Sequence, residues 1–288
     1  MVNHVEALLE LIRLTSTSLP DDVSRALEEA MKQEESPTAI QVFETILENV
    51  RLSRENSSAV CQDTGTPLFY VTHPGGESTR KIRNAIEEAV REATRLSILR
   101  PNAVDPITGK NSGDNIGKGF PYCSFSESDG GDLKIALMLK GGGSENVGAQ
   151  YRLPDESLKA GRDLEGVRRC IIDAAYRAQG KGCPPGILGV CIGGDRGSGY
   201  HQSKRELLRL IPDSNEDPAL ARLEARCLEE VNQLGIGPMG LGGRTTVLGV
   251  KIGALHRLPA CYFVTISYLC WADRRHAVTF RNGEITYD

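Results

Sequence analysis

Cysteine residues at three breaks in the sequence are the side chains best suited to chemistry. Cys61 begins a polar run, Cys183 stands between glycines and prolines, and Cys270 closes an apolar run. A thiolate is a soft metal ligand, and Gln62 and Asp63 place an amide and a carboxylate beside the first of them. Three dispersed cysteines without a CxxC pair indicate an iron–sulfur cluster with one unfilled position more than zinc, which prefers four closed ligands.

The other cysteines have simpler interpretations. Those within apolar stretches are predicted to be small buried side chains: Cys170, Cys191 and Cys227. Cys123 and Cys261 are also interpreted as structural. Cys261 nevertheless stays open as an alternative to Cys270, because both are expected near one end of the same strand pair. The histidines show no ligand-like spacing, and His256 is the one closest in sequence to a candidate site.

A glycine-rich turn supplies a further candidate feature. Gly141–Gly143 follow an apolar run and could present successive backbone N–H groups to an anion. They could equally form a tight turn that another segment approaches closely. The sequence has no GxxxxGK[ST] motif and no GxGxxG after a predicted strand, so nucleotide binding is disfavoured. A carboxylate is the favoured anion.

The composition predicts a globular protein of the cytoplasm. The chain has 288 residues, of which 40% are hydrophobic and 25% charged, as is usual for globular domains. A net charge of −4 offers no basic surface for nucleic acid. No apolar run reaches the roughly 20 residues of a membrane span, and the N-terminus lacks signal-peptide features. We therefore expect reduced thiols and neither nucleic acid nor membrane as a partner.

Apolar periodicity places secondary structure around these residues. Helical spacing predicts a helical N-terminal layer over about 1–55, and the core over about 56–288 alternates strands and helices. Strands are expected over 68–72, 133–139, 186–194, 245–252 and 261–269, with a terminal hairpin over 277–287. Helices are expected over 78–99, 163–179, 202–210 and 218–234. The fold class is α/β or α+β: one domain, 1–288, with mixed sheets, flanking helices and two lobes.

A series of short motifs recurs along most of the chain. They are Cys61–Gly65, Leu99–Asn102, Asn111–Asn115, Lys140–Asn146, Cys183–Pro185 followed by Ile192–Gly194, Gly235–Pro238 and Cys270–Ala272. In this order they resemble the catalytic α-region of the iron–sulfur hydro-lyases, which comprise the class I fumarate hydratases and the L-tartrate dehydratases. The resemblance covers about residues 38–276, and the combination is far more specific than any single motif.

The resemblance implies two sets of site residues. The ligands of a 4Fe-4S cluster, whose fourth iron has no protein ligand, would be Cys61, Cys183 and Cys270. The dicarboxylate substrate would be bound by Gln62, Asp63, Arg100 and Gly142 or Gly143. Asp63 could donate the proton that lets a bound hydroxyl leave as water. Arg100 offers the planar fork that pairs with a carboxylate.

Two departures from the family bear on function. The family places a histidine about twelve residues before the third cysteine, where this chain has Leu258. His256 would serve as a catalytic residue only if the loop shifts. Single-chain members continue into a C-terminal region, whereas this chain ends at Asp288 and resembles the separate α subunit. The resemblance thus implies a β-subunit partner, an α2β2 assembly and little activity alone.

The leading prediction is a hydro-lyase subunit that reversibly hydrates a dicarboxylate. Fumarate to malate is favoured, because Gly143–Asn146 is closer to the fumarase branch of the family. L-tartrate or another hydroxy-dicarboxylate is the alternative substrate. A non-catalytic cluster-binding protein and a structural zinc protein are hypotheses of another class, and analysis of bound metal and acid-labile sulfide distinguishes them.

Overall fold

The computed structural model describes residues 4–288, which form two compact units. The first unit contains the N-terminal residues through Pro20, Glu48–Gly142 and Ala272–Asp288, and the second contains Asp21–Leu47 and Gly143–Trp271. Each unit has a mixed sheet with helices packed on it, so the predicted α+β fold with two lobes is confirmed.

The helices at the start of the chain are divided between the units. The first unit takes α1 (His4–Thr17), and the second takes α2 (Asp21–Gln33). The boundary falls within α3 (Pro37–Asn56). None of the described helices combines the length and the apolar content that a membrane crossing requires.

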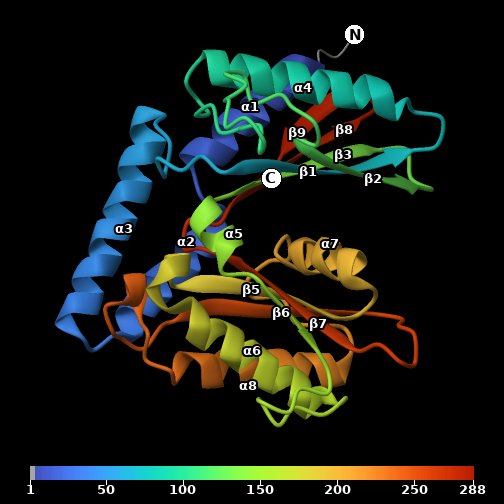
Figure 1. Cartoon of the computed structure of the whole chain (residues 1–288). Coiled ribbons are helices and arrows are strands. Elements are labelled where there is room, and N and C mark those ends of the chain that lie inside the picture. The colour runs from blue at the N-terminus through green and yellow to red at the C-terminus, as the bar shows by residue number, and fades with distance from the viewer. Residues whose placement is uncertain (1–3) are drawn as a thin grey trace. The chain divides into compact units, whose positions relative to one another are not determined.

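The sheet of the first unit has the strand order β2-β1-β3-β8-β9. Its strands are β1 (Thr66–Pro74), β2 (Tyr122–Ser128), β3 (Leu133–Lys140), β8 (Arg274–Arg281) and β9 (Glu284–Tyr287). β1 pairs in parallel with β2 and antiparallel with β3. The helices α1 and α4 (Thr79–Arg95) pack on one face of the sheet (Figure 1). Ser78 caps α4 by accepting a hydrogen bond from the Lys81 N–H.

Alternation along β3 and β8 fills the core beneath these helices. Every second residue of β3 is a buried aliphatic side chain: Leu133, Ile135, Leu137 and Leu139. Their partners on β8 are, in the same order, Phe280, Val278, His276 and Arg274. The core row of β8 therefore ends in a buried cation, 1% exposed, where the alternation would place an apolar side chain.

The sheet of the second unit has the order β4-β7-β5-β6. Its strands are β4 (Ala149–Arg152), β5 (Gly186–Gly193), β6 (Val247–Leu255) and β7 (Phe263–Leu269). β5 is parallel to β6 and antiparallel to β7. The helices α6 (Leu164–Ala178) and α8 (Pro218–Asn232) cover one face and α7 (Arg196–Glu206) covers the other (Figure 1). All of β5 is buried, as expected for a strand covered on both faces.

Helix α7 begins six residues earlier than the sequence predicts. Its start is fixed by Asp195, whose Oδ1 accepts hydrogen bonds from the N–H groups of Gly197 at 2.7 Å and Ser198 at 3.1 Å. This cap outweighs the low helix propensity of the two glycines in the first turn. The strands β2 and β4 and the short helix α5 (Gly142–Asn146) were not predicted.

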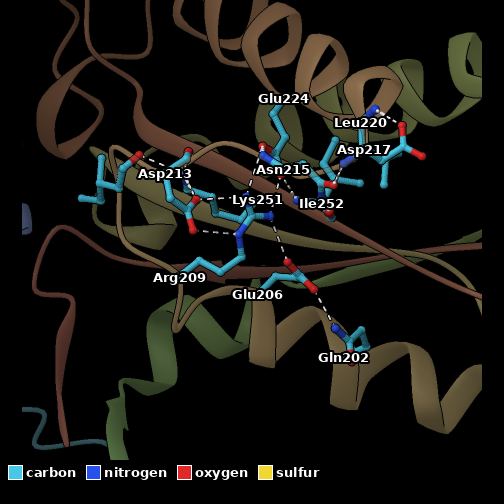
Figure 2. A network of polar contacts seen from close by, with 11 residues as sticks. Gln202, Glu206, Arg209, Asp213, Asn215, Asp217, Leu220, Glu224, Lys251 and Ile252 are labelled. Carbon is cyan, nitrogen blue, oxygen red and sulfur yellow. Dashed lines mark hydrogen bonds and ion pairs between the residues drawn. The ribbon is translucent and has the colours of Figure 1, made fainter.

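A polar network joins the segment after α7 to α8 and β6 (Figure 2). Lys251 is 3% exposed, and its Nζ donates to the Ile211 carbonyl at 2.9 Å and to the Asp213 carboxylate at 2.8 Å. Arg209 donates to Asp213 and to Glu224, which also accepts the Ile252 N–H at 2.7 Å. Each charge has a partner of opposite sign, so this network holds the unit together.

Candidate functional site

The turn that joins α3 to β1 holds the candidate acid, Asp63. Its Oδ1 accepts a hydrogen bond from the Gly65 N–H at 3.0 Å, and its Oδ2 accepts one from the Gly142 N–H at 2.7 Å. Gly65 has a φ of +78°, and a Cβ there would lie 2.7 Å from the backbone C and O of Lys140. Only glycine fits this position. The half-buried carboxylate is therefore held at both oxygens.

Hydrogen bonds beneath this turn connect it to Arg100. The buried Thr64 accepts at Oγ1 from the Arg100 N–H at 3.0 Å and from the Asn102 side chain at 3.1 Å. Asn115, 1% exposed, accepts the Asn102 N–H at 2.6 Å and donates to the Arg100 carbonyl at 2.7 Å. The exposed Arg100 guanidinium reaches the Gln62 carbonyl at 3.3 Å. The first unit thus brings together Cys61, Gln62, Asp63, Arg100 and Gly142.

Arg274 belongs to this group, and the sequence analysis missed it. Its Nη2 donates to the Asp63 carbonyl at 2.9 Å. Its Nε and Nη1 are buried and have no hydrogen-bond partner among residues 4–288. Burying a cation with so few partners is costly, so its presence favours a functional reason. An arginine in the apolar row of β8 was the signal that could have revealed it.

Cys183 and Cys270 come together at one end of the second sheet. Cys183 lies shortly before β5 and Cys270 directly follows β7, and the adjoining strand ends pair through Ile187 and Leu269. The Trp271 N–H donates to the Cys183 carbonyl at 3.1 Å. Neither cysteine is in a disulfide bond, and both are half-buried.

The backbone of Cys183 is left-handed, with φ 53° and ψ 64°. The residue ends the 3-10 helix η1 (Gln179–Gly182), which packs against η2 (Pro238–Gly240). The approach is close, because a Cβ on Gly240 would lie 2.6 Å from the Gly180 Cα. A left-handed residue other than glycine costs of order 1 kcal/mol or more, so the packing around it imposes this conformation.

Four other cysteines are unsuited to binding a metal. Burial raises the pKa of the thiols of Cys170, Cys191 and Cys227 to about 12, and it raises that of Cys123 to about 11. Burial makes these thiols harder to ionise, whereas a metal ligand must be a thiolate. The predicted packing roles of the first three are confirmed, because each is fully buried.

Cys261 lies at the opposite end of β7 from Cys270. The expectation that both lie near one end of the same strand pair is therefore wrong. The run before Phe263 forms a loop in place of the first residues of the expected strand, because the Arg257 guanidinium holds the carbonyls of Leu258, Pro259 and Cys261 at 3.0–3.1 Å. Cys270, and not Cys261, lies beside Cys183.

The two remaining candidates lie at different ends of the second unit. A Cβ on Gly143 would lie 3.3 Å from the Lys181 carbonyl, which places Gly143 beside η1 and the Cys183 segment. His256 follows β6 and lines a shallow pocket of about 420 Å³. Because β5 and β6 are parallel, this pocket is a strand length, roughly 20 Å, from Cys183. The second unit does not bring His256 together with its cysteines.

Within either unit taken by itself, no three His, Cys, Asp or Glu side chains among residues 4–288 form a metal-binding group. The first unit carries Cys61, and the second carries Cys183 and Cys270. The donor types still fit an iron–sulfur cluster, because the three cysteines are half-buried and in no disulfide bond, while burial raises the pKa of the core thiols.

The fold and site define a mixed α/β protein whose fixed carboxylate lies between backbone amides and beside an exposed arginine. Residues 5–279 match the family described as fumarate hydratase (Fumerase), and the chain belongs to that family.

Individual relatives carry two kinds of name. A Geobacillus stearothermophilus protein named "Putative fumarate hydratase class I" is 47% identical over 286 residues, which are 97% of this chain and 56% of that protein. A Methanocaldococcus jannaschii protein named "Putative L(+)-tartrate dehydratase subunit alpha" is 37% identical, over 94% of this chain and 95% of its own. The "L(+)-tartrate dehydratase subunit alpha" of Escherichia coli K12 is 32% identical, over 96% of this chain and 92% of that protein. The chain spans about half of the first relative and nearly all of the others.

Proposed function

We propose that this chain is the α subunit of a hydro-lyase that adds water reversibly to an unsaturated dicarboxylate, with fumarate to malate as its main reaction. One observation carries the proposal. The Asp63 carboxylate is fixed by two backbone N–H groups, in a turn that also contains Cys61 and whose Gln62 carbonyl accepts a hydrogen bond from the exposed Arg100. A proton-transfer group, a candidate metal ligand and a carboxylate-binding cation thus lie together in the first unit.

A 4Fe-4S cluster would be held by Cys61, Cys183 and Cys270. When bound, it supplies an iron with an open coordination position, which acts as a Lewis acid on a hydroxyl group or water. Arg100 pairs with one substrate carboxylate through its planar fork, and Gly142 or Gly143 is proposed as a further substrate contact. Gln62 orients the substrate through its exposed amide.

Asp63 moves the proton that is exchanged when water is added or lost. Its two backbone hydrogen bonds leave further lone pairs on the carboxylate, so it can exchange a proton without giving up its position. His256 lies at the end of the second sheet away from Cys183, so no proton-transfer role is proposed for it. The Asp63 role does not depend on it.

The substrate and partner follow from the relatives. The higher identity to the protein named as a fumarate hydratase favours fumarate, and near-complete coverage of the two tartrate dehydratase α subunits favours L-tartrate as the alternative. The same subunit names support a separate β subunit, and an α2β2 assembly is the stoichiometry that we propose. None of the eight cysteines is in a disulfide bond, which suits the reducing cytoplasm that we propose as the compartment.

The test is to purify the chain without air, with and without a co-expressed β subunit. Iron, acid-labile sulfide and the EPR spectrum after brief oxidation are measured first, and then the rates with fumarate, L-tartrate and mesaconate. A three-iron signal after oxidation and hydration of fumarate by the complex are expected. Zinc without sulfide would refute the proposal, and faster turnover of L-tartrate would select the alternative.

A further inference from the structure

We propose that Tyr268 is a positioning residue that sets Cys183 against Cys270 for binding of the cluster, an inference that rests on the proposed function. Tyr268 lies on β7 two residues before Cys270 and is 2% exposed. It pairs with Leu188 of β5, the strand that begins just after the Cys183 segment. Its ring therefore lies where the two cysteine segments meet.

The Tyr268 ring fills space that two glycines leave open. A Cβ on Gly182 would lie 2.6 Å from Tyr268 Cε1, and a Cβ on Gly186 would lie 2.3 Å from Tyr268 Cζ. Real Cβ atoms do not approach so closely, so both positions require glycine for packing reasons. Because Gly182 and Gly186 stand on either side of Cys183, the ring supports the segment before and after the thiol.

The phenol lies near both proposed ligands. It lies on β7 two residues before Cys270, and its ring lies against the glycines that flank Cys183. A phenol carries no charge near pH 7, so the side chain adds bulk without adding charge.

Two contacts together determine how the cysteine segments are placed. One is the hydrogen bond from the Trp271 N–H to the Cys183 carbonyl, at 3.1 Å, which draws the segments together. The other is the packing of the Tyr268 ring against Gly182 and Gly186, which limits how closely the two cysteine segments approach each other. A metal site tolerates only small errors in ligand position, so losing the ring impairs binding even where the thiols remain.

The experiment compares four variants of the full chain with the wild type and with one control variant, after anaerobic reconstitution with iron and sulfide. Tyr268→Phe keeps the ring, Tyr268→Leu removes it, and Gly186→Ala is tested alone and together with Tyr268→Leu. The matched control is Ile266→Ala, which opens a cavity in the same core and on the same strand without touching either glycine. Bound iron and sulfide, the EPR spectrum and the melting temperature of the metal-free chain are measured for each.

Tyr268→Phe is expected to bind the cluster as the wild type does. Tyr268→Leu should lose at least half of the bound iron, while Ile266→Ala lowers the melting temperature but keeps the cluster and its spectrum. Gly186→Ala alone should also lose iron, and the double variant should recover part of it because the smaller leucine makes room for the new methyl group.

Three results would overturn the inference. Full cluster content with an unchanged EPR spectrum in Tyr268→Leu would show that the ring does not position the two cysteines. Equal iron loss in Ile266→Ala would reduce the effect to general destabilisation. A wild-type chain that takes up no iron or sulfide would reject the proposed function itself, and the inference with it.

Discussion

The side chains of Arg274 and Asp63 both lie close to Gly141. A Cβ on Gly141 would lie 3.1 Å from Asp63 Oδ2 and 3.9 Å from Arg274 Nη2. The guanidinium also donates to the Asp63 carbonyl, so it fixes the backbone of the residue whose carboxylate is held by Gly65 and Gly142. The candidate acid is thus positioned from its main chain and its side chain independently.

Arg274→Met is expected to lower kcat/KM of the complex at least tenfold, or about 1.4 kcal/mol of transition-state stabilisation. The melting temperature should stay the same or rise, because an apolar side chain of similar length replaces a poorly satisfied buried cation. Steady-state kinetics and thermal unfolding measure the two effects. Arg281→Met, at the exposed end of the same strand, is the control and should change neither. A lower melting temperature with full activity would contradict the assigned role.

Asp63→Asn is expected to reduce turnover about 100-fold or more, since it removes the group that exchanges the proton. The new amide can accept at only one position, so one of the N–H groups of Gly65 and Gly142 faces a donor. Asp105→Asn is the matched control, because Asp105 Oδ1 likewise accepts two N–H groups, from Ile107 and Thr108, in an exposed turn. Turnover of fumarate by the two complexes separates them, and similar losses in both would argue against a role in proton transfer.

Cys270→Ser is expected to abolish the cluster, and Cys261→Ser is expected to leave it intact. The reason is that the Cys270 segment, and not Cys261, is hydrogen-bonded to Cys183. Iron and sulfide analysis of both variants after reconstitution decides the matter. Cys191→Ala serves as the buried control, since its thiol is protonated and lies in the core. Cluster loss in Cys261→Ser alone would reverse the assignment.

Lys251→Met is expected to lower the free energy of unfolding by about 2–4 kcal/mol, because it leaves buried oxygen atoms without a donor. The affected groups are the Ile211 and Asp213 carbonyls and one oxygen of the Asp213 carboxylate. Urea titration of the metal-free chain measures the loss. Lys134→Met, on the exposed side of β3, should change the free energy by less than about 0.5 kcal/mol. If Lys251→Met binds as much cluster as the wild type at low urea, the loss of stability does not arise from the cysteine site.

The stability of the chain is expected to fall as the pH drops below about 6.5, in part through His276. Burial lowers the pKa of His276 below its usual value of 6.5, although the Asp288 carbonyl partly opposes this. Between the lowered pKa and 6.5 the unfolded chain binds a proton that the folded chain does not. The contribution of His276 to the free energy of unfolding is therefore complete above pH 6.5, and it is lost as the pH falls toward the lowered pKa of the folded state. His276→Gln should flatten the unfolding free energy against pH between about pH 7 and pH 5, and an unchanged slope would refute it.

Much of the framework followed from the sequence because its signals are local. Apolar periodicity located α4, α6 and α8, and the run around β5 reads as a buried strand. The Asn282-Gly283 turn of the β8–β9 hairpin carries positive φ at both residues, as its sequence indicates. The polar run at Cys61 also marked a turn directly.

The missed features depend on contacts between distant residues. β2 is an edge strand of half-buried residues, so its pattern is weak. Arg274 reads as a surface charge next to Arg275, and only the register with β3 shows that it ends a core row. The separation of His256 from Cys270 follows from the parallel pairing of β5 with β6 and the antiparallel pairing of β5 with β7, which periodicity cannot supply.

The left-handed backbone at Cys183 makes a cysteine less favourable than a glycine at this position, so selection must maintain the cysteine. Replacing Cys183 by glycine would relieve about 1 kcal/mol of strain and make the metal-free protein more stable. In a gene copy that is no longer selected for activity, Cys183→Gly would raise the stability of the protein and would be tolerated. With Cys183 as the proposed cluster ligand, persistence of cysteine at this position would mark lineages that still bind the cluster, and genome sequences alone would reveal it.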